Sequence, residues 1–105
     1  MYQAPVVNYA HVQAQATLNL ATYNVLQLAA DEGVREDRML VYERELQIKQ
    51  TRGLVQAQEI TRLNDAIARA RDEWYLARQR TEHARQAERQ ARVNLAAVRP
   101  QGNRR

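Results

Sequence analysis

The 105-residue chain carries 16 lysine and arginine residues against 12 aspartate and glutamate residues, a net charge of +4, and it contains no cysteine. The missing thiols exclude disulfides, zinc–thiolate sites and cysteine nucleophiles. With five tyrosines, one tryptophan and no phenylalanine, the packing must come mainly from aliphatic side chains and alanine, so we expect an all-α protein.

Residues 1–30 contain no aspartate, glutamate, lysine or arginine. We expect an extended lead-in over residues 1–8, which ends at the candidate helix cap Asn8, and a charge-free first helix over residues 9–32. Residues 12–20 alternate apolar and polar side chains as a strand does, but the helical spacing persists over a longer span. This spacing marks the residues expected to pack the first helix: Ala14, Leu18, Ala21, Val25 and Leu28.

A short turn is predicted at Gly33, because glycine readily adopts the left-handed conformation that ends a helix. We expect a long second helix over residues 34–98, with a kink near Gly53 as a candidate interruption. The basic residues 99–105 include proline and glycine and are typical of a flexible tail. Together these elements predict an elongated antiparallel helical hairpin with one long coiled-coil-like second helix.

The second predicted helix has a seam of mainly apolar or small residues, at alternating spacings of three and four, between residues 60 and 98. Four alanines, seven residues apart, permit another helix to approach closely. The first helix, folded back from Gly33, would reach only to about residue 57, so we expect the seam to pack against another chain. The residues assigned to this oligomer or partner seam are Ile60, Leu63, Ile67, Ala70, Trp74, Ala77, Ala84, Ala91, Leu95 and Val98.

Arginines recur every seven residues beside this seam and continue into the basic C-terminus. The arginine ladder is interpreted in one of two ways. It forms a strip that contacts the phosphates of nucleic acid or another anionic partner, or it forms flank residues that pair with carboxylates of a neighbouring helix. The candidate anionic-partner contacts are Arg71, Arg78, Arg85, Arg92, Arg99, Arg104 and Arg105.

The sequence contains no recognisable catalytic or metal-binding constellation. His11 and His83 lie in different segments without a carboxylate at ligand spacing, and no phosphate-cradling glycine loop or nucleophile motif occurs. We therefore expect no enzyme activity, no cofactor and no small-molecule substrate. The N-terminal residues lack the basic region of a signal peptide, and no run of about 18 apolar residues occurs, so we expect cytoplasmic synthesis.

These features predict a non-enzymatic structural protein that assembles through helix–helix contacts, as a homo-oligomer or with another helical protein. In composition and architecture the chain is similar to small helical components of larger machines, such as internal or ejection proteins of short-tailed phage virions and stalk proteins of bacterial secretion systems. Incorporation into a virion or a membrane-spanning machine would then follow cytoplasmic synthesis. Two alternatives stay open, namely nucleic-acid binding through the arginine ladder and membrane association or pore formation by residues 1–30.

Overall fold

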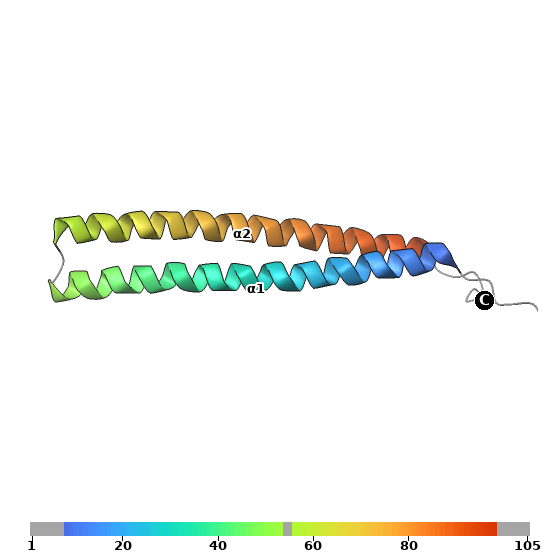
Figure 1. Cartoon of the computed structure of the whole chain (residues 1–105), viewed down its shortest axis with the longest axis horizontal. Helices are drawn as coiled ribbons and strands as arrows, with labels where there is room; N and C mark the ends of the chain where they lie inside the picture. Colours follow the sequence, from blue (N-terminus) through green and yellow to red (C-terminus); the bar gives the residue numbers. More distant parts are fainter. Residues whose placement is uncertain (1–7, 54–55, 99–105) are drawn as a thin grey trace, which may run out of the picture.

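The computed structural model describes residues 8–53 and 56–98, which form two long helices. Helix α1 covers Tyr9–Arg52 and helix α2 covers Ala57–Ala97. The helices lie side by side, run in opposite directions and form a hairpin 68 Å long (Figure 1). The predicted all-α, elongated helical hairpin is confirmed, and the described residues contain no strand. The start of α1 and the end of α2 meet at the same end of the hairpin.

Helix α1 begins where the sequence predicts. Asn8 has an extended backbone, and its side-chain oxygen accepts a hydrogen bond from the His11 backbone N–H at 3.1 Å. This cap satisfies one of the donors that the first turn of a helix leaves free. Residues 12–20 are helical, because the longer helical spacing outweighs the local alternation of apolar and polar residues. Residues 1–7 of the expected lead-in over residues 1–8 lie outside the described residues, as does the tail over residues 99–105.

The predicted turn at Gly33 is wrong, because α1 continues through this residue to Arg52. The chain turns instead after Gly53, which has a φ of 66° and caps α1. Its backbone N–H donates to the Gln50 carbonyl oxygen at 3.2 Å. A residue without a side chain adopts this left-handed conformation with little strain, which is why α1 ends at this glycine.

Helix α1 passes Gly33 because its packing positions continue without a break on both sides of this residue. A glycine inside a helix costs about 1 kcal/mol relative to alanine. The packing positions of α1 that pair with α2 extend past Gly33 to the buried Met39 and beyond, and burial of one such side chain contributes about 1.5–3 kcal/mol, so these contacts outweigh the cost of the glycine. The buried or half-buried positions of α1 at spacings of three and four are His11, Ala14, Leu18, Ala21, Val25, Leu28, Glu32, Arg35, Met39, Tyr42, Leu46 and Lys49.

Helix α2 is shorter than the predicted second helix, since it begins at Ala57 and not at residue 34. The predicted kink near Gly53 is therefore a full reversal of the chain. With 44 residues, α1 is slightly longer than α2, which has 41. The expected mismatch in helix length is wrong, and with it the argument that most of the seam of α2 lacks a partner within the chain.

Contacts near both ends of the hairpin set the register of the two helices. The Asn8 side-chain amide donates to the Val98 carbonyl oxygen at 3.4 Å, and the Lys49 ammonium pairs with Glu59 near the turn. Between these contacts, the small alanines of α2 face core positions of α1 that carry mostly larger side chains, so the helices approach closely without overpacking.

Candidate interaction surface

The predicted seam of α2 lies in the core of the hairpin. All of its assigned residues are buried or half-buried, and Ala77 is only 2% exposed. The five residues expected to pack the first helix are half-buried on the matching side of α1. The two predicted seams therefore face each other within one chain, and α1 covers the surface that we expected another chain to cover.

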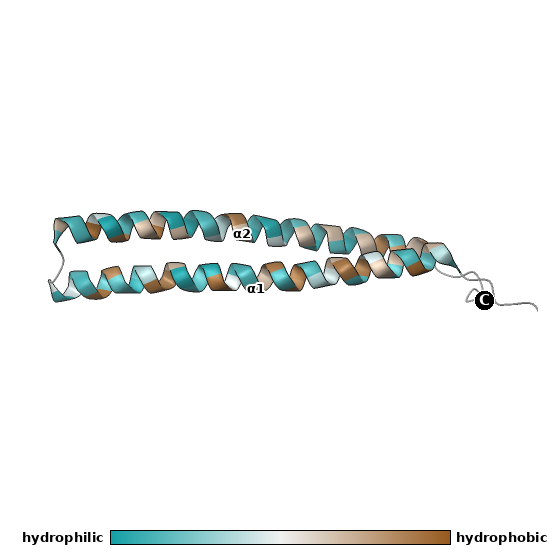
Figure 2. Ribbon diagram, in the orientation of Figure 1, coloured by the Kyte–Doolittle hydropathy of each residue, from teal (hydrophilic) through white to brown (hydrophobic). Residues whose placement is uncertain are grey.

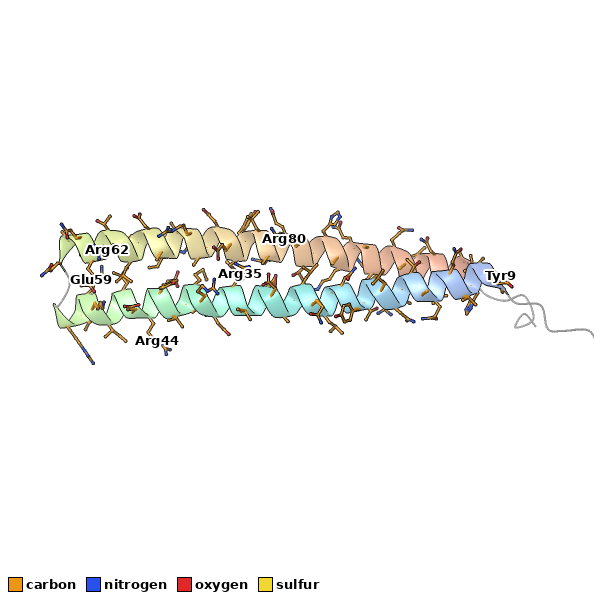
Figure 3. The ribbon with its side chains drawn as sticks, in the orientation of Figure 1. Tyr9, Arg35, Arg44, Glu59, Arg62 and Arg80 are labelled. Atoms are coloured by element: carbon orange, nitrogen blue, oxygen red, sulfur yellow. The ribbon has the colours of Figure 1, made fainter. Side chains whose placement is uncertain are left out.

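Two cations at core positions of α1 are held by carboxylates of α2. Arg35 donates to Glu73 at 2.9 Å, and Lys49 pairs with Glu59 and, at 3.2 Å, with Glu45 of its own helix. Figure 3 shows Arg35 and Glu59 directed into the space between the helices. The hydrogen bond to Glu73 raises the pKa of Arg35, and the hydrogen bond to Glu59 raises the pKa of Lys49. Both side chains are therefore positively charged at neutral pH, and their ion pairs are formed there.

Other polar side chains in the core differ in how well they are satisfied. The fully buried Thr81 hydroxyl donates to the Ala77 carbonyl oxygen at 3.0 Å. Glu88, whose side chain is 18% exposed, lies 3.6 Å from the Arg92 guanidinium one turn further along α2. Glu32 Oε1 is buried and has no hydrogen-bond partner within the described part of the chain. A buried acceptor without a partner costs roughly 1–3 kcal/mol, so Glu32 weakens the middle of the hairpin.

The arginine ladder is engaged in part by its own chain. Two guanidinium nitrogens of Arg71 lie 2.7 and 3.1 Å from Glu43 Oε1 on α1, as expected if the ladder pairs with a neighbouring helix. The Arg78 guanidinium carbon lies 5.6 Å from the centre of the Trp74 ring, within range of a cation–π contact. Three members of the ladder lie outside the described residues, namely Arg99, Arg104 and Arg105.

Large apolar side chains also line the side of α1 that faces away from α2. We call six of them the outer α1 face: Tyr9, Val12, Leu20, Tyr23, Leu26 and Val34. Their exposed fractions range from 56% to 76%. With Ala16 and Ala30 between them, these residues follow one another at spacings of three or four and form a continuous stripe. Figure 2 shows brown, hydrophobic segments along α1, including its half nearest the chain ends.

The outer α1 face is unusual because no charged residue interrupts it. Residues 1–30 contain no aspartate, glutamate, lysine or arginine, and the first acidic residues, Asp31 and Glu32, are half-buried away from this face. The solvated face of a helix ordinarily carries charged side chains. Sequence reasoning identified the charge-free segment but missed the outer α1 face, although its residues also recur at helical spacing.

The two halves of the hairpin are held together differently. The described ion pairs between α1 and α2 all lie in the half nearer the turn, where Glu43, Glu59 and Glu73 accept from cations of the opposite helix. In the half nearer the chain ends, α1 offers no carboxylate to the arginines of α2. Apolar contacts therefore dominate the end of the hairpin that also carries most of the outer α1 face.

Within residues 8–53 and 56–98, no three histidine, aspartate or glutamate side chains form a group that could hold a metal ion. Neither described helix has a stretch long and apolar enough to cross a membrane. Comparison of the chain with protein-family models, with curated proteins and with solved structures finds no match.

Proposed function

We propose that the protein is a non-enzymatic assembly protein whose outer α1 face packs against another helical protein surface. The observation that carries the proposal is the exposure of six large apolar side chains along the outer side of α1, before its first exposed charged residues, Glu36 and Asp37. Continuous apolar surface of this kind marks sites where proteins contact one another. A helix with apolar residues on both its inner and outer sides is typical of a helix enclosed between neighbours.

The free energy available from covering this surface is comparable with the cost of association. Full burial of a valine or leucine side chain contributes about 1.5–3 kcal/mol, so covering six side chains that are each more than half exposed contributes roughly 6–10 kcal/mol. Association costs about 4–15 kcal/mol in lost translational and rotational freedom. A stable complex therefore needs a partner that contributes apolar surface of its own.

The missing charges have a physical reason under this proposal. A charged side chain enclosed by a partner without a counter-charge costs several kcal/mol, whereas the same side chain in water costs nothing. An outer helix face without charges is thus suited to burial in coiled-coil-like packing. Such a protein would serve as a small component of a larger machine, and a phage virion or a secretion apparatus is the kind of assembly to which its composition is similar.

Nucleic-acid binding by the arginine ladder has less support. Two of the four described members of the ladder are already paired with carboxylates, Arg71 with Glu43 and Arg92 with Glu88 of its own helix. A strip that follows a phosphate backbone needs guanidinium groups that are free of carboxylates. A band shift with nucleic acid that weakens steeply with salt would favour this alternative.

The test places a photo-crosslinking amino acid at Tyr23, on the outer α1 face, in cells of the natural source. The matched control carries the same amino acid at Tyr75 of α2, because the two tyrosines are 58% and 57% exposed. We expect position 23 to form a discrete crosslink to a protein and position 75 to form few or none. Crosslinks of position 23 mainly to lipid, or equal protein crosslinks from both positions, would contradict the proposal.

A further inference from the structure

We propose that a second copy of this chain covers the outer α1 face. The two α1 helices pack antiparallel about a two-fold axis near Leu20, and the two α2 helices lie on the outside. This inference rests on the proposed function and names the partner. The order of the helices across the dimer follows from the hairpin, because the outer α1 face lies on the side of α1 opposite the positions that pack against α2.

The area of the outer α1 face suits a self-complementary contact. In this register Val34 lies beyond the partner's α1, so five side chains of the outer α1 face are covered, each presenting roughly 100 Å² at its observed exposure. Two copies would bury roughly 1,000 Å² of these side chains together, which is about the minimum for a specific interface. A two-fold axis matches one patch with itself, so uncharged residues meet uncharged residues across the whole contact.

The order of side chains along α1 favours an antiparallel over a parallel pair. The line of residues that points most directly away from α2 repeats every seven residues and alternates large and small: Tyr9, Ala16, Tyr23 and Ala30. Reversal of one copy places each tyrosine level with an alanine of the other, so large side chains fill the space beside small ones. A parallel pair would instead place tyrosine beside tyrosine and leave the alanines facing each other.

Charges further along the same line lead to the same orientation. After Ala30, the next residues at this spacing are Asp37 and Arg44, both exposed, and Figure 3 shows Arg44 directed away from α2. A parallel pair would place each of these charges against its own copy, and like charges at close range repel. An antiparallel pair centred near Leu20 leaves both residues beyond the contact, each at an opposite end of the dimer.

The first experiment is sedimentation of the full chain over a range of concentrations. We expect a monomer–dimer equilibrium between 12.2 kDa and twice this mass. Tyr23→Lys should raise the dissociation constant of the dimer at least about ten-fold, because the two-fold axis places the substituted side chain in the contact twice, once from each copy. Tyr75→Lys, at a tyrosine of equal exposure on α2, should leave it unchanged. A monomer at every concentration, or equal effects of the two variants, would overturn the inference.

The second experiment tests the orientation with single-cysteine variants, since the chain has no cysteine of its own. Under mild oxidation, Leu20→Cys should crosslink to itself. Ala30→Cys should not, but should crosslink to Tyr9→Cys when the two variants are mixed. Ala68→Cys, on an exposed position of α2, is the control and should stay monomeric. Self-crosslinking of Ala30→Cys would show a parallel pair and overturn the proposed arrangement.

Failure of this inference and failure of the proposed function give different results. If the purified chain stays monomeric while photo-crosslinking at position 23 captures a different protein, the inference that a second copy covers the outer α1 face is wrong, and the proposed assembly function stands. If the chain dimerises with the expected cysteine pattern, both are supported. If the chain is monomeric and position 23 captures no protein, both fail.

Discussion

Gly33 inside α1 and Gly53 at its C-terminal cap offer a test of where the chain reverses, because the same substitution should have opposite effects at the two sites. Gly33 lies inside α1, its φ is not positive, and an added Cβ would have no other heavy atom within 4 Å. Gly33→Ala should therefore stabilise the hairpin by about 0.5–1 kcal/mol, through the higher helix propensity of alanine and the smaller entropy of the unfolded chain. For a chain of this size, the melting temperature should rise by roughly 2–8 °C.

Gly53→Ala should act in the opposite direction. The space around Gly53 is also open, but its φ of 66° is unfavourable for a residue with a Cβ, at a cost of about 1–2 kcal/mol. Urea unfolding followed by circular dichroism measures both variants, at one chain concentration so that any association is held constant. The double variant should show nearly additive effects, because the glycines are distant from each other. Destabilisation by Gly33→Ala together with stabilisation by Gly53→Ala would place the turn at Gly33 and refute the reasoning.

Three further perturbations test the core of the hairpin. Ala77→Leu overpacks a position that is 2% exposed and should destabilise the fold by about 1–3 kcal/mol in urea unfolding, whereas Ala68→Leu, on the exposed side of α2, should change stability by less than about 0.5 kcal/mol. Equal effects would show that the register is wrong. Glu32→Leu removes a buried oxygen without a partner and should raise the melting temperature; a decrease would mean that this carboxylate is satisfied in solution. The hydrogen bond to Glu59 raises the pKa of Lys49 in the folded chain. The stabilisation by this ion pair should therefore be complete at pH values below the unfolded pKa of about 10.4, and it should be lost as the pH rises through the higher folded pKa. Lys49→Met should flatten this alkaline loss in a pH series of melting temperatures, and an unchanged pH profile would exclude the pair as its cause.

Both packing seams were predictable from the sequence because helical periodicity is a local property. The spacing of Leu18, Val25 and Leu28 in the first half of the chain, and of Leu63, Ile67 and Ala70 in the second, depends only on residues within two turns. The Asn8 cap was predictable for the same reason, since it requires one side chain and a backbone N–H three residues away. The all-α fold follows from these features with no knowledge of long-range contacts.

The position of the turn and the identity of the exposed face required the tertiary structure. Gly33 and Gly53 each permit a helix end locally, and the choice between them depends on how many positions the two arms can pair across the hairpin, which is a property of the whole chain. A turn at Gly53 gives two helices of nearly equal length, so α1 covers the whole seam of α2 within the chain. The outer α1 face could not be distinguished from a core seam by its spacing, because apolar residues lie on both sides of α1. A hairpin gives α1 only one neighbour, so only one side is buried, and the Tyr23 side of the helix stays uncovered in the single chain.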